Sequence, residues 1–253
     1  MRKGEQTRAA IVDAALELAS RTGLEGLTIG ALAERMQMSK SGVFAHFGSR
    51  EDLQIAVLKE YERRFSADVL VPSVKEKRGL PRVRAIFERW VERTAIEAAS
   101  GCIWISGAVE YDDRPGSIRD ELVKMLHAWR RELTRAIDQA VEVGDLPAGV
   151  DVDDLMFQLY GLILVLHHDG RLLRNLDSVP RARRSFERVI DSYRQRVSSP
   201  QPSPQPLQSP QSPQSSPQSQ SSPQPQSSPQ SQSQPQSSPP SPRRGAAQEP
   251  TAA

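Results

Sequence analysis

The sequence contains a single cysteine, Cys102, and this scarcity excludes two kinds of site. One thiol cannot form a disulfide within the chain, nor a zinc site made of several cysteines. Long hydrophobic runs are also absent, because the longest, at residues 162–166 with its neighbours, is far too short to span a bilayer. The first ten residues are polar and hold no apolar segment for secretion. We therefore expect a cytoplasmic protein without a membrane partner.

A strong charge of one sign is lacking as well. The formal net charge is +2, and residues 1–65 hold ten Lys or Arg and nine Asp or Glu residues. The overall charge therefore does not indicate nucleic acid, and only a local charge distribution can do so. The chain shows no strand pattern with turn signals, no internal repeat and no Gly-rich phosphate loop. No group of residues indicates an enzyme, and we expect neither catalysis nor a cofactor.

Apolar residues recur at helical spacing along residues 7–197, and Gly, Pro and capping residues separate the periodic segments. Gly23 stands where a left-handed helix end belongs, and breaks are expected at residues 71–73 and 78–79. The sequence therefore predicts an all-α protein with about nine helices. The expected helices span residues 7–21, 29–36, 40–45, 50–65, 81–99, 102–110, 117–143, 151–176 and 180–197.

Residues 198–253 differ sharply from the rest of the chain, because they are Ser, Pro and Gln with almost no large apolar residue. Such a segment cannot bury enough surface to offset the entropy of ordering. We expect a disordered tail. The remaining 197 residues suffice for a proper hydrophobic core.

The stretch at residues 28–47 predicts two short helices joined by a tight turn. Thr28 and Ser39 each stand where a hydroxyl caps a helix start, with the turn at residues 36–38 between them. Val43 and Phe47 are expected to anchor the second helix inward. This arrangement is typical of a helix-turn-helix whose second helix enters the major groove.

The outer face of the second helix is expected to carry Lys40, Ser41, Gly42 and Ala45, which are small or basic. No acidic residue lies between positions 34 and 51, although four basic or histidine residues do. A local window without carboxylates suits a phosphate backbone, because each negative charge would repel it.

The sequence at residues 28–53, with its HFGSREDL ending, resembles the DNA-binding domain of the tetracycline-repressor-like (TetR) transcriptional regulators. The resemblance covers about the first 65 residues. Two positions depart from the family: Gln37 stands where Gly is usual, and Phe44 stands where a Tyr hydroxyl usually contacts a phosphate. Together with the residue pattern, the resemblance implies that the DNA contacts come from Thr28, Ser39, Lys40, Ser41, Gly42, Phe44, His46 and Arg50.

The resemblance also implies the domain organisation: a helix-turn-helix DNA-binding domain at residues 5–65, a helical effector-binding and dimerisation domain at 66–197, and the tail at 198–253. The expected function is that of a dimeric repressor, released from a palindromic double-stranded DNA operator by a small apolar effector. The alternative is an all-helical small-molecule-binding protein whose DNA binding is weak or lost.

Three tryptophans and a methionine form the candidate effector pocket: Trp90, Trp104, Met125 and Trp129. Each is also a plausible core residue, and both interpretations stay open. Apolar faces on the last two helices predict a four-helix interface between two subunits. Their residues are Phe157, Tyr160, Gly161, Leu164 and Val165 on one helix, and Phe186, Val189, Ile190 and Tyr193 on the next.

Four further features have a functional and a structural interpretation. Cys102 with His127 is a nucleophile or a buried core thiol, and we favour the core thiol. The residues 167–169 (His-His-Asp) bind a metal only poorly, because adjacent helical side chains point about 100° apart. Glu110 near Asp112 has two interpretations, a site that recognises a cation or the edge of a solvated loop, and we favour the loop edge. The basic residues Arg2, Lys3 and Arg8 enter a groove or form a solvated flexible arm, again the second being favoured.

Overall fold

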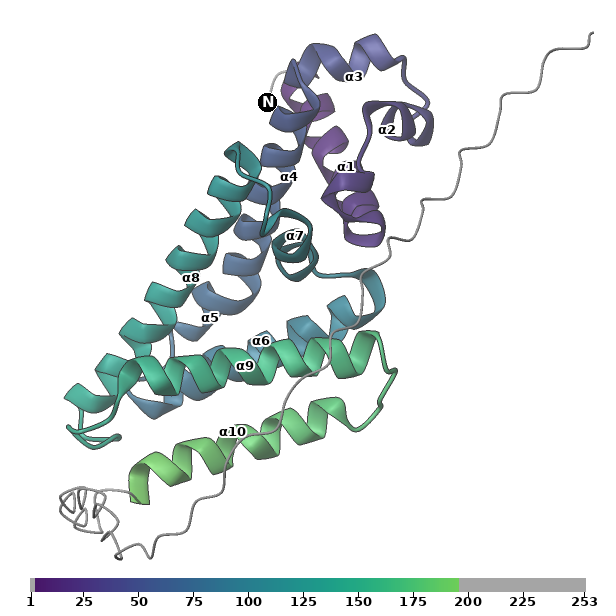
Figure 1. Ribbon diagram of the computed structural model, residues 1–253. Helices are drawn as coiled ribbons and strands as arrows, with labels where there is room; N and C mark the ends of the chain where they lie inside the picture. Colours follow the sequence, from purple (N-terminus) through teal and green to yellow (C-terminus); the bar gives the residue numbers. More distant parts are fainter. Residues whose placement is uncertain (1–2, 196–253) are drawn as a thin grey trace, which may run out of the picture. The chain divides into compact units, whose positions relative to one another are not determined.

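The computed structural model describes residues 3–195, and within that range the chain is all-α (Figure 1). If the continuous segment α4–η1–α5 is taken as one helix, the described part holds nine helices, which confirms the prediction. The tail predicted at residues 198–253 lies outside the described residues. The elements are α1 Lys3–Gly26, α2 Ile29–Arg35, α3 Lys40–Phe47, α4 Arg50–Phe65, η1 Ser66–Leu70, α5 Val71–Ser73, α6 Leu80–Ser100, α7 Ile103–Tyr111, α8 Ser117–Glu142, α9 Val152–Arg171 and α10 Ser178–Gln195.

The first helix is longer than predicted. α1 begins at Lys3 instead of residue 7, so Lys3 and Arg8 belong to a helix and not to a flexible arm. The Arg8 guanidinium lies 4.8 Å from the centroid of the Phe47 ring. Gly23 has the positive φ expected of it, 78°, but its ψ of 169° is extended and helical bonding resumes up to Gly26. A Cβ at Gly23 would lie 2.0 Å from a Glu110 carboxylate oxygen, so only glycine fits.

The small N-terminal bundle is α1, α2, α3 and the first half of α4. Its core consists of side chains with no exposed surface, because each helix turns its apolar stripe inward. This core is Ile11, Leu24, Leu32, Val43 and Leu53. The bundle therefore holds α3 by its inner face and leaves the outer face free.

The break predicted at residues 71–73 is wrong, because the helix continues through a π-helical turn, η1, and a short α5 that ends at Ser73. Pro72 does not stop the helix, although it has no N–H to donate: it directly follows the π-helical turn, in which the Val71 amide donates to the Ser66 carbonyl five residues back. The Ser73 hydroxyl donates to the Val69 carbonyl at 2.6 Å. The break comes at Gly79, whose φ is 109°, just before α6.

The C-terminal helices pack around α6 and α9, and α10 lies against both (Figure 1). The Phe87 ring of α6 stacks on Phe186 of α10 with their centroids 4.2 Å apart. α9 ends at Arg171, earlier than the predicted residue 176. On α6 Ala95 is exposed, whereas the polar residues Thr94 and Glu97 are buried. Among residues 3–195 no helix has the length and apolar character needed to cross a membrane.

Candidate nucleic-acid interface and effector cavity

The two short helices α2 and α3 form as their capping residues predict. The Thr28 hydroxyl accepts from the Ala31 amide at 3.1 Å, and the Ser39 hydroxyl accepts from the Gly42 amide at 3.0 Å. Both hydroxyls therefore satisfy amides that a helix start leaves free. The turn between the helices places Gln37 at a φ of 54°, so this residue adopts the left-handed conformation that a glycine would take more easily.

The outer face of α3 is exposed and free of carboxylates. Lys40, Ser41, Phe44 and Ala45 are exposed, whereas Val43 and Phe47 are buried. The Phe44 side chain is 50 % exposed and does not belong to the buried core.

The remaining predicted contact residues divide into two groups. Thr28 and Ser39 use their hydroxyls as caps, although both side chains are exposed at the same surface. Gly42 and His46 are half-buried on α3, and the His46 ring lies 6.5 Å from Phe47, centroid to centroid. The structure thus exposes Thr28 and Ser39 as well as Lys40, Ser41 and Phe44, and leaves Gly42 and His46 half-buried on α3.

Arg50 lies apart from that surface, because its guanidinium binds the segment before α2. Its Nε donates to the Leu27 carbonyl at 2.9 Å, and its Nη2 lies 3.3 Å from the Glu25 carboxylate. The side chain joins the start of α4 to the end of α1. These contacts engage Nε and Nη2, and the DNA contact expected of Arg50 stays a prediction.

Glu25 is the centre of a contact between the DNA-facing end and α7. The Tyr111 hydroxyl donates to the Glu25 carboxylate at 2.6 Å, and the Gln54 amide donates to the Leu24 carbonyl at 2.6 Å and to the Tyr111 oxygen at 3.2 Å. The hydrogen bond from Tyr111, and then the Arg50 guanidinium, hold the pKa of Glu25 below its ordinary value against the opposing effect of burial.

The Glu110 carboxylate belongs to the same contact, because it accepts from the Glu25 backbone amide at 2.8 Å. It therefore holds a helix end instead of a cation. Sequence reasoning missed Gln54 and Tyr111, whose positions on apolar helix faces gave no sign of a partner far along the chain.

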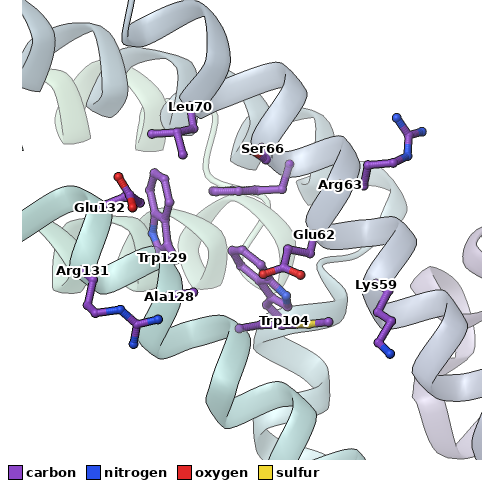
Figure 2. A pocket seen from close by; sticks show the side chains of 12 residues that line it. Lys59, Glu62, Arg63, Ser66, Leu70, Trp104, Ala128, Trp129, Arg131 and Glu132 are labelled. Atoms are coloured by element: carbon purple, nitrogen blue, oxygen red, sulfur yellow. The ribbon is translucent and has the colours of Figure 1, made fainter.

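A cavity of about 360 Å³ opens between α4, η1, α7 and α8 (Figure 2). Trp104, Met125 and Trp129 line it, as the sequence predicted, together with Phe65, Ser66 and Leu70. Its volume lies within the usual range of small-molecule sites. One wall is the π-helical turn η1, a feature that occurs mostly at functional positions.

Trp90 was predicted to line this cavity and does not. Its ring lies behind the wall, 4.9 Å from Trp129 and 5.3 Å from Tyr160 between centroids. Phe65 lines the cavity at the place that was predicted for Trp90. The centroid of the Phe65 ring lies 4.5 Å from that of Trp104 and 4.7 Å from that of Trp129. The sequence placed Phe65 on the apolar face of its helix, but periodicity cannot distinguish a cavity wall from a core position.

Charged side chains surround the mouth of the cavity. Lys59, Arg63 and Arg131 are exposed, and Glu62 and Glu132 are half-buried. Figure 2 shows the two indoles between Lys59 on one side and Arg131 on the other. The cavity therefore has an apolar, aromatic interior and an ionic rim.

Cys102 is buried, and its sulfur lies 3.2 Å from the Tyr61 hydroxyl. Burial raises the pKa of the thiol well above its ordinary value, which disfavours the thiolate a nucleophile needs. His127 lines a separate surface pocket on α8 with Arg130 and Arg131. Across residues 3–195 no group of three His, Cys, Asp or Glu side chains is arranged to hold a metal ion, and the His168 Nδ1 lies 3.5 Å from its neighbour Asp169.

The residues predicted to face a second subunit are exposed on α9 but mostly buried on α10. On α9 Phe157 is 68 % exposed and Val165 is 59 % exposed, and Leu164 beside them is exposed too. On α10 the prediction was wrong for Phe186, Ile190 and Tyr193, because these three are buried within the same chain. α10 packs against α6 and α9, so these three residues are covered within the same chain and do not form an exposed apolar face.

Comparison with known proteins agrees with this arrangement. Residues 11–57 match the family model described as bacterial regulatory proteins, tetR family, and residues 79–186 match the model of the tetracyclin repressor-like C-terminal domain. The HTH-type transcriptional regulator SrpR of Pseudomonas putida is 25% identical over 175 residues, which are 69% of this chain and 79% of that protein.

Two solved structures share the fold. A TetR-family transcriptional regulator from Cytophaga hutchinsonii superposes with a TM-score of 0.66 and 18% identity, covering 77% of this chain and 98% of the other. AibR, solved in complex with isovaleryl coenzyme A and operator DNA, superposes with a TM-score of 0.53 and 20% identity, covering 75% and 96%.

Proposed function

The chain belongs to the tetracycline-repressor-like (TetR) family of transcriptional regulators, and from that premise we propose that it is a dimeric, ligand-responsive repressor. It binds a palindromic operator through α3 and leaves it when a small apolar effector occupies the cavity between α4, α7 and α8. The observation that carries the proposal is the pairing of an exposed, carboxylate-free α3 face with an aromatic cavity in the same helical unit. We also propose a cytoplasmic location, because the matching family model describes bacterial regulatory proteins, whose DNA lies in the cytoplasm.

The DNA contacts are assigned to the outward face of α3. Lys40 approaches a phosphate or a base edge, Ser41 donates to a phosphate, and the Phe44 ring lies beside the phosphate backbone without a hydroxyl to bond it. Thr28 and Ser39 support the surface as caps, while Gly42 lets the backbone approach the groove closely. His46 stands at the end of α3 beside the backbone of the DNA. Arg50 acts indirectly, by fixing the segment before α2 against α4.

Dimerisation is assigned chiefly to the exposed face of α9. Phe157, Leu164 and Val165 form an apolar surface that a single chain leaves in water, and Gly161 among them has open space where a Cβ would stand. Such a surface favours a partner, and a second copy supplies one by two-fold symmetry. α10 contributes its half-buried Val189 at the edge.

The switch follows from the position of α7. Trp104 of α7 lines the cavity, and Glu110 and Tyr111 at the other end of the same helix bind the segment before α2. An effector that packs better in one arrangement of α4 and α7 biases the separation of the two α3 helices, which must meet successive major grooves about 34–36 Å apart. AibR was solved with both a small ligand and operator DNA, which supports the same pairing of ligands here.

A small-molecule carrier with weak DNA binding is the second candidate. Gln37 and Phe44 favour it, because one adopts an unfavourable backbone conformation and the other lacks a phosphate-binding hydroxyl. The capped, exposed α3 favours the repressor, since a carrier has no need of a carboxylate-free face.

The test is DNA binding by the full chain and by Lys40→Ala. A site is first enriched from random double-stranded DNA with the wild-type protein, and its affinity is then measured by fluorescence anisotropy at several salt concentrations. We expect a palindromic site, a bound dimer, and affinity about tenfold weaker for Lys40→Ala with a salt slope smaller by about one. Lys124→Ala, which removes an exposed lysine on α8, is the matched control and should leave affinity unchanged. Failure to enrich any site would favour the carrier.

A further inference from the structure

The exposed face of α9 is a stripe that runs along most of the helix. Phe157 and Leu164 lie on it and are 68 % and 42 % exposed. Asp153 is exposed towards its amino end, and His168 is exposed towards its carboxyl end. With Gly161 between the two apolar residues, these positions recur every three or four residues, so they share one side of the helix. The order along the stripe is therefore acid, apolar, glycine, apolar, histidine.

This order is centred on one point of the helix. Gly161 lies next to the midpoint between Phe157 and Leu164, and next to the midpoint between Asp153 and His168 as well. When a helix pairs with its own copy in antiparallel orientation, positions on opposite sides of the two-fold axis meet each other. Each apolar residue then meets the other apolar residue, and the acid meets the histidine. In a parallel pair each residue would meet its own copy, acid against acid.

The two ends of α9 also differ in charge. Asp151 caps the amino end, and Asp153 and Asp154 lie in the first turn. The last turn is basic, with His168 and Arg171. Because opposite charges attract and like charges repel, two copies are favoured when the acidic end of each meets the basic end of the other. The charge pattern therefore indicates the same antiparallel orientation as the order of the stripe.

Gly161 gives this face a place for close approach. No other part of the described chain lies within 4 Å of the point where a Cβ of Gly161 would stand. A glycine inside a helix is destabilising relative to alanine, and no described neighbour in the same chain needs the space. A crossing helix does need it, because two backbones come closest where a side chain is missing.

We propose that α9 pairs with α9 of a second copy in antiparallel orientation and crosses it at Gly161. Phe157 packs against Leu164 of the partner subunit, and Asp153 faces His168 of the partner subunit. This pairing rests on the proposed function, because that function requires a dimer. It goes further by fixing the orientation of the two helices and the residues that meet.

Cysteine cross-linking of the full chain tests the orientation. The wild type gives the background, because its own Cys102 is buried. On oxidation, Gly161→Cys should form a disulfide-linked dimer, and so should the double variant Phe157→Cys/Leu164→Cys. Neither Phe157→Cys nor Leu164→Cys alone should do so, because each position lies about 10 Å along the helix from its own copy. A disulfide requires Cα atoms within about 7 Å.

The outcomes separate the pairing from the proposed dimer, which sedimentation velocity measures on the same samples. The double variant keeps the test decisive if a side chain at Gly161 prevents the close approach. A cross-link in either single variant would overturn the antiparallel orientation. A dimer in sedimentation without any cross-link in the double variant would overturn the pairing of α9 with itself. A chain that stays monomeric would count against the proposed dimer, and the pairing would fail with it.

Charge reversal tests the contact between the acid and the histidine. Asp153→Lys should raise the Kd of the dimer about tenfold in sedimentation equilibrium, because two attractive contacts become repulsive. Adding His168→Glu to that variant should restore most of the affinity, which a structural role of Asp153 within its own chain would not predict. Asp120→Lys, which changes an exposed acid on α8, is the control and should leave the Kd unchanged. A double variant no tighter than Asp153→Lys would contradict the assigned contact.

Discussion

The outward face of α3 and the aromatic cavity belong to one helical unit, but they are constructed by opposite means. The α3 face depends on neighbours in sequence, since its caps at Thr28 and Ser39 bond to amides three residues away. The cavity depends on residues from α4, α7 and α8 that lie far apart in the chain. Single substitutions can therefore alter the α3 face one residue at a time, whereas the shape of the cavity depends on how whole helices pack.

The contact at Glu25 connects these two regions. It joins the segment before α2 to Tyr111 and Glu110 of α7, and Trp104 on the same helix lines the cavity. Under the proposed function, these polar contacts are the connection between the α3 surface, which local sequence specifies, and the cavity, which depends on the packing of distant helices. The predictions below separate the two regions or test that joint.

Val165→Glu should have the largest effect, because it places a charge in the surface we assign to the subunit interface. Burying an uncompensated carboxylate costs about 3–5 kcal/mol, so the dimer should dissociate at concentrations where the wild type stays paired. Sedimentation velocity measures the change. Val109→Glu, which alters an exposed valine on α7, should leave the dimer intact. A dimer that survives Val165→Glu would place the interface elsewhere.

Phe44→Tyr should strengthen operator binding by about tenfold. Phe44 is 50 % exposed on α3, and the family position it occupies usually presents a hydroxyl to a phosphate. A hydrogen bond to a charged group contributes about 1.5–3 kcal/mol, part of which is lost to desolvation. Anisotropy titration with the enriched site measures the gain. Unchanged affinity would show that this side chain does not approach the phosphates.

Tyr111→Phe should lower the stability of the fold slightly and should weaken the coupling between the cavity and operator binding. It removes the hydrogen bond to Glu25 at 2.6 Å, which contributes about 1 kcal/mol, or roughly 2–4 °C in melting temperature. Because the pKa of Glu25 is lowered in the folded chain, this contribution is present above the ordinary pKa of a glutamate and is lost as the pH falls below it.

The same variant should also weaken the effect of cavity ligands on operator affinity. Tyr160→Phe is its control, because the Tyr160 hydroxyl has no hydrogen bond in the described part of the chain. A Tyr111→Phe protein with unchanged coupling would show that the signal does not pass through this joint.

Deleting residues 198–253 should change least. The segment is Ser, Pro and Gln with no apolar periodicity, so the sequence gives it no means to dock. Melting temperature, dimerisation and operator affinity should stay nearly the same, as calorimetry, sedimentation and anisotropy would show. Loss of the dimer after truncation would mean that the segment packs against the rest.

Local patterns predicted the DNA-facing end almost completely. Both caps and the buried positions of Val43 and Phe47 follow from spacing within a few residues, whereas the left-handed turn at Gln37 follows from the resemblance to a family that usually has glycine there. The contact between Arg50 and the Leu27 carbonyl was not foreseen, because a basic residue next to a helix start looks the same whether or not it binds a carbonyl of the preceding segment.

Long-range packing limited the rest of the prediction. Periodicity identified the apolar faces of α6, α8 and α10, but it cannot say which neighbour covers each face. Trp90 consequently lies behind the cavity wall, and Phe186 and Ile190 lie in the core of their own chain instead of at a subunit interface. The π-helical turn through residues 66–70 was unpredictable for a related reason, since no residue type marks it.

The reciprocal effect of two ligands tests the central claim most directly, namely that the cavity and the α3 face are coupled. The measurement is the Kd of the tightest cavity ligand found in a screen of small apolar compounds, determined by calorimetry for the free protein and for the protein saturated with its enriched operator. We predict that the operator weakens ligand binding by about 5–150-fold, and that the ligand weakens operator binding by the same factor. Identical ligand affinities for free and operator-bound protein would contradict the account.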